Sequence, residues 1–309
     1  MTQDVQIGQP QRVGPLEVWP LRWHGLSDQK YQGPPFTSQL KFDEFDDGDG
    51  PQVGHITVEN LTDSDFIIPS GWIVGADLMQ VRSFNGFEYI PAGESMLADV
   101  SCVEKGRWAD GSNTVDAGRA PLSVIAAGWD YEPSRGQWVI NTSERQSRVW
   151  NQVSRQESRS GTRPTNSLEQ VMREDSVSDL EVSSVQREIQ SSFRTFDGQN
   201  GMLVALEGDP LMLEVYSDEH ASRKILTETL RAISFDSVGI AYRSLKKSQV
   251  QDFIQNSEVR DMHMLSDDDW ALLMAGGNER IDTRGAMSRD GKLIQVSAIN
   301  RNHRILLEV

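Results

Sequence analysis

Strand-like and helix-like segments fall in separate blocks along this chain, and that order constrains the fold more than any other feature of the sequence. Short β-branched and aromatic runs come first, punctuated by turn residues such as Pro91-Ala92-Gly93. The alternation in residues 16–21 is typical of a half-buried strand. Helical patterns begin only near Asn141. Because strands and helices do not alternate, we predict an α+β fold with a β-rich N-terminal half.

Two turn sequences predict hairpins. Asn85-Gly86 lies between Phe84 and Phe87, and Asn-Gly between apolar residues is a strong short-range hairpin signal. Residues 201–206 and 211–216 are both apolar, and they flank Gly208-Asp209-Pro210. Proline is tolerated at a strand start, where its missing N–H does least harm. We therefore expect hairpins at both places.

The second half of the chain mixes helices with strands. Asn141 and Glu144 have the spacing of a capping box, which predicts a helix that starts there. A second helical run carries apolar residues between 177 and 196. A third helix is predicted over residues 218–232, with an apolar stripe on one face. The end of the chain reads as an antiparallel meander in which residues 286–288, 292–298 and 303–309 pair.

A polar connector divides the sequence. Residues 158–166 contain no apolar side chain, so burial cannot offset the entropy of ordering them. We expect a β-rich subdomain over residues 1–157 that closes with a helix, a flexible connector over residues 158–166, and a mixed α+β subdomain over residues 167–309. The three parts are expected to form one integrated domain.

The charge balance narrows the range of partners. Asp and Glu number 46 against 30 Lys and Arg, a formal net charge of −16. This charge repels phosphate backbones and anionic lipids, so we expect no nucleic-acid partner and no membrane partner. A local basic groove stays open in one arginine-rich stretch, made of Arg145, Arg148, Arg155, Arg159 and Arg163. No signal peptide or membrane-spanning run is seen, so a cytoplasmic location is expected.

Metal and cofactor motifs are missing from the sequence. The histidines are scattered, and no nucleotide-binding glycine loop or Gly-x-Ser-x-Gly nucleophile motif occurs. The acidic run over residues 43–51 lacks the alternating ligands and closing Glu of a calcium loop. Cys102 is the one cysteine, which rules out an intramolecular disulfide and a multi-cysteine metal site. We predict neither a metal nor a cofactor.

One segment gathers chemically useful side chains. Cys102, Glu104, Arg107 and Trp108 fall at the end of one predicted strand and in its turn. Arg107 and Lys105 would favour a thiolate, and Glu104 would oppose it. The plainer interpretation is a buried, inert thiol on a strand, with Glu104 and Arg107 paired over the turn, and we favour it. Cys102 and Glu104 stay as weak catalytic candidates.

The same segment carries a resemblance to a known family. Its residues Ser101, Cys102, Val103, Glu104, Gly106, Arg107 and Trp108 match a signature in order. The sequence thereby resembles the bacterial domain family named for its association with ADP-ribosylglycohydrolases and rhodanese-phosphatase proteins. Further matches run in order along most of the chain, at residues 16–21, 58–60, 75–76, 91–93, 149–153 and 204–236. The resemblance implies a genomic link with ADP-ribose chemistry, which is association and not mechanism.

The chain departs from that family at one place. After Gly75-Ala76 the family usually shows Lys-Gln-Asn-Arg, a run suited to holding an anion. Here residues 77–80 read Asp-Leu-Met-Gln, and the nearest arginine is Arg82. The missing Lys and Arg remove most of the charge that such a site needs. Either the anion is held elsewhere, or this member has kept the scaffold and dropped the activity.

These observations lead to one main hypothesis and two alternatives. The chain is predicted to be an accessory module that binds a small molecule or a protein partner, linked to ADP-ribose or nucleotide metabolism. The predicted lining of its ligand site is Gly75, Gln80, Arg82, Glu104, Arg107 and Trp108. The first alternative is an enzyme that acts on an ADP-ribose-like or nucleotide-derived substrate. The second is a subunit of a larger assembly that docks through residues 158–166.

Overall fold

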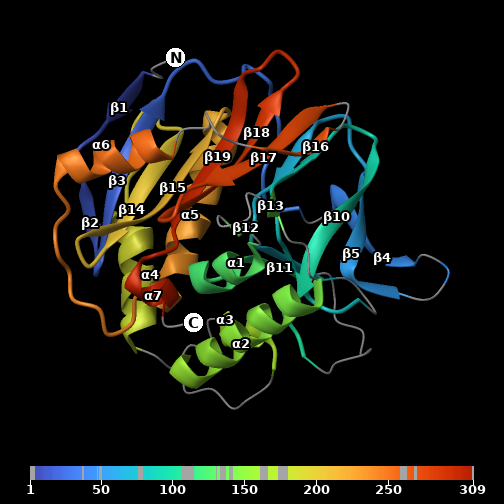
Figure 1. The fold of residues 1–309 in the computed structure, drawn as a ribbon, viewed down its shortest axis with the longest axis horizontal. Helices are drawn as coiled ribbons and strands as arrows, with labels where there is room; N and C mark the ends of the chain where they lie inside the picture. Colours follow the sequence, from blue (N-terminus) through green and yellow to red (C-terminus); the bar gives the residue numbers. More distant parts are fainter. Residues whose placement is uncertain are drawn as a thin grey trace. The chain divides into compact units, whose positions relative to one another are not determined.

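The chain forms two compact units that are interleaved along the sequence. The first unit takes residues 1–30, 131–137 and 184–309, and the second takes residues 31–130 and 138–183. The computed structural model (Figure 1) describes residues 4–36, 38–46, 48, 51–75, 79–105, 115–129, 131–132, 137–138, 142–160, 166–172, 180–257, 263–267 and 270–307. Because antiparallel sheets dominate and helices come in blocks, the predicted α+β class is confirmed.

The first unit is built on one antiparallel sheet with the order β1-β3-β14-β15-β19-β18-β17-β16, and β2 pairs with β3 off this path. Its strands are β1 (Val5–Ile7), β2 (Gln11–Val13), β3 (Leu16–Trp23), β14 (Gly201–Leu206), β15 (Asp209–Tyr216), β16 (His263–Asp267), β17 (Ala271–Gly277), β18 (Ile281–Ser288) and β19 (Leu293–Asn300). Its helices are α5 (Glu219–Asp236), α6 (Lys247–Asn256) and α7 (Arg304–Leu307). Helix α4 (Leu180–Ser192) runs across the sequence boundary of the units at Ser184.

Helices cover both faces of this sheet. Every residue of β14 is buried. Leu203 and Leu213 pack with Phe253 of α6 in one core cluster. Side chains alternate between the two faces of a strand, so Glu214 points the other way, and there it accepts a hydrogen bond from Thr229 of α5 at 2.8 Å. The sheet is therefore a packed middle layer between α5 and α6 (Figure 1).

Helix α5 follows the pattern that predicted it. Asp218 caps its N-terminus, where its side chain accepts from the backbone N–H groups of His220 and Ala221. Its apolar stripe, which includes Ile225 and Leu230, is fully buried. The predicted helix is thus present, and it extends to Asp236.

Among the predictions for the C-terminal strands, one hairpin and the meander are present, and the last strand is not. The hairpin around residues 208–210 is confirmed, because β14 pairs with β15. The meander is present as β17, β18 and β19. Its expected last strand at residues 303–309 is wrong, since Arg304–Leu307 forms the short helix α7. The His303 ring bonds to the Leu206 carbonyl at 3.0 Å, and this bond holds the start of the helix against the end of β14.

The second unit contains a smaller antiparallel sheet with the order β11-β7-β8-β10-β5-β4, and a separate pair of strands, β6 and β9. The strands are β4 (Leu40–Asp46), β5 (Pro51–Asn60), β6 (Phe66–Ile68), β7 (Trp72–Gly75), β8 (Arg82–Phe84), β9 (Glu88–Ile90), β10 (Ser95–Cys102) and β11 (Val115–Arg119). The helices are α1 (Leu122–Gly128), α2 (Thr142–Ser160) and α3 (Leu168–Met172). A further pair, β12 (Tyr131–Glu132) and β13 (Gln137–Trp138), lies between α1 and α2 in sequence.

The hairpin predicted at Asn85-Gly86 is wrong. Strands β8 and β9 flank this turn, but β8 pairs with β7 and β10, whereas β9 pairs with β6. The polar groups of Asn85 explain the difference. Its backbone N–H donates to Asp99 and its Oδ1 accepts from Ser101, so the turn is bound to β10 and the chain leaves for another sheet.

The arginine-rich stretch lies largely in α2, where carboxylates neutralise two of its charges. Arg145 is buried and forms two hydrogen bonds with Asp99, at 2.8 and 2.5 Å. Arg148 pairs with Glu144 one turn earlier at 3.8 Å. Ser158, Arg159 and Ser160 are the last residues of α2, and residues 161–165 lie outside the described part. The connector over residues 158–166 and the division of the sequence around it stay predictions.

Candidate functional site

Strand β8 and the end of β10 bring four of the predicted site residues together. Cys102 is the Cα partner of Arg82, and Gln80 lies two residues before Arg82 on the same side of the chain. The Gln80 Oε1 atom accepts a hydrogen bond from Arg82 Nη1 at 2.8 Å and one from the Cys102 thiol at 3.4 Å. The thiol also reaches the carbonyl of Glu104 at 2.8 Å. We call Gln80, Arg82, Cys102 and Glu104 the Arg82 cluster.

Arg82 carries a buried charge that is incompletely neutralised. Its side chain is 2% exposed, and it pairs with Glu44 of β4 at 3.4 Å, which is longer than a typical charge-assisted hydrogen bond. Within the described part of the chain, its buried Nε–H has no hydrogen-bond partner. An unsatisfied donor on a buried cation is costly, because the group has lost its water without full replacement. The guanidinium can therefore donate a hydrogen bond to one further acceptor.

The thiol of Cys102 is held in its protonated form. Cys102 is 1% exposed, and burial raises the pKa of its thiol, while the nearby Arg82 charge acts in the opposite direction with smaller effect. The single S–H proton of the thiol lies between two acceptors, Gln80 Oε1 and the carbonyl oxygen of Glu104. Burial and a raised pKa are typical of structural thiols, whereas activated cysteines have a lowered pKa.

Glu104 is fixed between two neighbouring segments. Its side chain is buried, and Oε2 accepts from the backbone N–H of Val81 at 3.3 Å. Its backbone forms a bridge to Ser167, and the next residue, Lys105, donates to the Asn166 carbonyl at 2.7 Å. The carboxylate consequently joins the segment before β8 to the end of β10.

The remaining predicted residues are less closely tied to the cluster. Gly75 ends β7 and is the Cα partner of Val115. It follows Val74, the Cα partner of Arg82, so it lies at the margin of the cluster. Arg107 and Trp108 lie outside the described residues, as do Asp77 and Leu78. The predicted lining as a whole stays a prediction.

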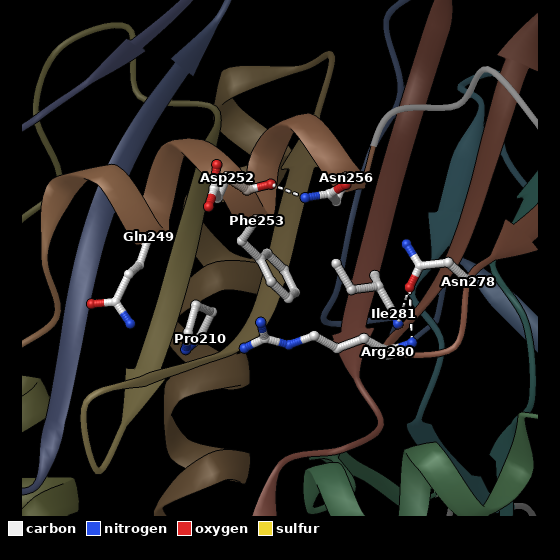
Figure 2. Close-up of a pocket in the computed structure, with 8 residues that line it drawn as sticks. All are labelled: Pro210, Gln249, Asp252, Phe253, Asn256, Asn278, Arg280 and Ile281. Carbon is white, nitrogen blue, oxygen red and sulfur yellow. Dashed lines mark hydrogen bonds between the residues drawn. The ribbon is translucent and has the colours of Figure 1, made fainter.

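A groove in the first unit was missed by sequence reasoning (Figure 2). It has a volume of about 240 Å³ and opens between α6 and the turn that joins β17 to β18. Pro210, at the start of β15, also contributes to the groove. The lining residues are Pro210, Gln249, Asp252, Phe253, Asn256, Asn278, Arg280 and Ile281.

Hydrogen bonds within the lining fix the walls of the groove. Asn278 Oδ1 accepts from the backbone N–H groups of Arg280 and Ile281, at 2.8 and 2.9 Å. The Arg280 side chain extends beneath Phe253, and its Nη2 bonds to Asp209 at 2.7 Å (Figure 2). One signal for the groove is present in the sequence. Residues 249, 252, 253 and 256 have the i, i+3, i+4, i+7 spacing of one helix face.

Among the described residues, His, Cys, Asp and Glu form no group of three or more that would hold a metal ion. No helix in the described ranges has the length and apolar character needed to cross a membrane.

The comparisons with known proteins agree with the resemblance noted in the sequence. The family model that matches covers residues 4–299 and is described as the ARG and Rhodanese-Phosphatase-superfamily-associated Protein domain. No curated protein and no solved structure matches the chain.

Proposed function

The chain belongs to this ARG and Rhodanese-Phosphatase-superfamily-associated family, and from that membership we propose that it is an accessory module that binds a small anionic ligand through the Arg82 cluster. The family description links the domain with other proteins and names no reaction of its own. ADP-ribose and related nucleotide-derived compounds are the ligands that this association suggests. They carry phosphate groups, which arginine recognises with paired hydrogen bonds.

The observation that carries the proposal is the state of Arg82. Its guanidinium is buried, its carboxylate partner is 3.4 Å away, and its Nε–H lacks an acceptor in the described part of the chain. A phosphate or carboxylate oxygen would satisfy that donor and complete the neutralisation of the charge. Gln80 orients the guanidinium through its bond to Nη1.

The cluster supports binding better than thiol catalysis. Burial raises the pKa of the Cys102 thiol, and the groups that surround it accept its hydrogen bond instead of removing its proton. A nucleophilic cysteine requires a lowered pKa or an adjacent base. The alternative that the chain is a subunit of a larger assembly has weaker support. The exposed apolar side chains lie on separate elements, among them Leu97 of β10 and Trp270 before β17.

Native mass spectrometry of freshly purified protein tests the proposal. The wild-type protein should retain a phosphate-containing small molecule, and the Arg82→Gln variant should lose it. Arg119→Gln is the matched control, because Arg119 is equally buried in the same sheet and its Nε donates to the Ser70 carbonyl. The control should keep the ligand even if its melting temperature falls as far.

A second measurement covers the case in which the purified protein has lost its ligand. Calorimetric titration with ADP-ribose should give binding to wild-type protein and much weaker binding to Arg82→Lys, which keeps the charge but loses the planar fork. Equal binding of phosphate compounds by folded Arg82→Gln would contradict the proposal. So would stoichiometric retention of a protein partner with no small molecule in any preparation.

A further inference from the structure

We propose that the groove between α6 and the β17–β18 turn binds a small, neutral, polyhydroxyl compound of the size of a monosaccharide or cyclic polyol. The groove belongs to the first unit, whereas the Arg82 cluster belongs to the second. It is therefore a second site, with a ligand chemistry different from that of the proposed function.

The shape of the groove sets the size of the ligand. Its volume of about 240 Å³ lies below the roughly 300–1,000 Å³ of sites that hold drug-sized molecules. Pro210, Phe253 and Ile281 are buried and give it an apolar floor. In Figure 2 the polar groups of Gln249, Asp252 and Asn256 lie along the helix above this floor. A compact molecule with C–H groups on one face and polar groups on its edge fits this arrangement.

Hydrogen-bonding capacity in the helix wall is unused. Within the described residues, the Asp252 carboxylate forms no ion pair and no hydrogen bond, so both of its oxygens can accept. Gln249 Oε1 accepts from the backbone N–H of Lys246 at 3.2 Å, which leaves its Nε2 as a donor. Asn256 Nδ2 donates to the Asp252 backbone carbonyl at 2.8 Å, which leaves its Oδ1 as an acceptor. Donors and acceptors therefore stand side by side.

The opposite wall adds further donors. Arg280 uses Nη2 for Asp209 at 2.7 Å, and a guanidinium has five N–H groups, so most of its donors stay available. Hydroxyl groups are the ligand groups that match such a mixture, because each one both donates and accepts. A ring that carries several hydroxyls could meet Asp252, Gln249 and Arg280 at once.

The charge of the groove disfavours an anion. Asp209 neutralises Arg280, and Asp252 adds a carboxylate with no cationic partner in the described chain. The chain as a whole carries a net charge of −16. A phosphate or carboxylate ligand would meet repulsion from Asp252, whereas a neutral ligand would not. For this reason the site is assigned to neutral polyols and not to nucleotides.

Calorimetric titration of the full chain tests the assignment. The probes are D-glucose, D-xylose and myo-inositol, with inorganic phosphate and glycine as charged comparisons. At least one of the three polyols should bind with a dissociation constant in the millimolar range or below. Phosphate should not bind at this site, because Asp252 repels it. If none of the three polyols binds, the assignment is wrong.

Matched variants place the binding in the groove. Asp252→Asn should weaken polyol binding at least about tenfold, because a hydrogen bond to a charged group is lost. Gln249→Ala should weaken it by about three- to tenfold. Two controls on exposed side chains outside the groove, Asp197→Asn and Gln251→Ala, should stay within about twofold of wild type.

The same variants also define what would overturn the assignment. Polyol binding that is equally strong in folded Asp252→Asn and Gln249→Ala protein would place the ligand elsewhere. Phosphate or glycine binding that depends on Asp252 would assign the groove to a different chemistry. Circular dichroism should show folded protein in all four variants, so that a loss of binding is not a loss of fold. The melting temperature should match wild type in three of them and should fall slightly in Gln249→Ala, which also loses the capping bond to Lys246.

Discussion

The side chain of Gln146 forms hydrogen bonds with both backbone groups of Cys102. Its Oε1 accepts from the Cys102 N–H at 2.8 Å, and its Nε2 donates to the Cys102 carbonyl at 2.7 Å. Strand β5 pairs with β10 up to Asp99 and then leaves that edge. Gln146, on helix α2, takes the place of the missing strand at Cys102. A helix side chain thus completes the sheet beside the Arg82 cluster.

Removing this side chain should destabilise the fold. In Gln146→Ala, the buried N–H and C=O of Cys102 lose their partners, and each such group costs about 1–3 kcal/mol. We expect a loss of about 2–4 kcal/mol in the free energy of unfolding, measured by urea denaturation. Asn151→Ala removes an exposed carboxamide from the same helix and should change stability by about 0.5 kcal/mol or less. Similar values for the two variants would contradict the role of Gln146.

Cys102 should react slowly with alkylating reagents in the native state. It is 1% exposed, so the reagent has little access to the sulfur. Burial also raises the pKa of the thiol, so little of it is ionised to the reactive thiolate at neutral pH. Mass spectrometry after treatment with iodoacetamide should show little modification until urea unfolds the protein. Rapid labelling of folded protein at pH 7 would instead make Cys102 a candidate nucleophile.

The same thiol should make stability depend on pH in the alkaline range. Because its pKa is raised in the folded state, the unfolded chain loses the proton first as the pH passes the usual thiol value of 9.0. Stability is unaffected below that pH and should fall above it by up to about 1.4 kcal/mol per pH unit, until the folded thiol ionises. Cys102→Ser lacks this titration. The difference in unfolding free energy between the two proteins should therefore change above pH 9 and stay constant below it.

Two substitutions of Glu104 separate its hydrogen bond from its charge. Glu104→Gln keeps an oxygen that can accept from the backbone N–H of Val81, whereas Glu104→Ala leaves that buried donor without a partner. We expect Glu104→Ala to be less stable than Glu104→Gln by about 1–3 kcal/mol. If Glu104→Gln is as unstable as Glu104→Ala, the negative charge and not the hydrogen bond is what the fold requires.

Alanine substitutions at Gly71 and Gly93 separate the cost of steric crowding from the cost of backbone strain. Both have a positive φ, +81° and +72°, so alanine is strained at either position. A Cβ at Gly71 would overlap the Ile125 side chain, whereas a Cβ at Gly93 would meet open space. Gly93→Ala should cost about 1–2 kcal/mol, and Gly71→Ala should cost about 1–3 kcal/mol more. Thermal unfolding of the two variants measures the difference directly, and equal melting temperatures would show that Ile125 moves aside freely.

Local patterns predicted the fold well where they agreed with the tertiary contacts. The helix that begins after Asp218 and the hairpin from Gly201 to Tyr216 follow directly from capping and turn residues. The Asn85-Gly86 hairpin failed because pairing in a sheet is decided by distant strands, and Asn85 is bound to β10. The last predicted strand failed because the His303 ring bonds to the end of β14, far away in the sequence.

The candidate sites were predicted less completely, for a similar reason. Cys102 and Glu104 lie in one sequence motif, and Arg82 was identified separately as the arginine nearest to Gly75-Ala76. Gln146 and Glu44 complete the same cluster from α2 and β4, and no local pattern links them to it. The groove is assembled from β15, α6 and the β17–β18 turn, whose polar residues are ordinary surface residues until the sheet places them together.

Strand β3 is synthesised long before β14, the strand that pairs with one of its edges. Strand β3 emerges from the ribosome early, but on one side it pairs with β14, which follows only after the whole range of the second unit. Domains tend to fold as they emerge, so the second unit has its complete sequence before β3 has its inner partner. Until then the edge of β3 that pairs with β14 is open, on a strand that carries Trp19 and Trp23. Nascent or C-terminally truncated chains are therefore the forms expected to need a chaperone.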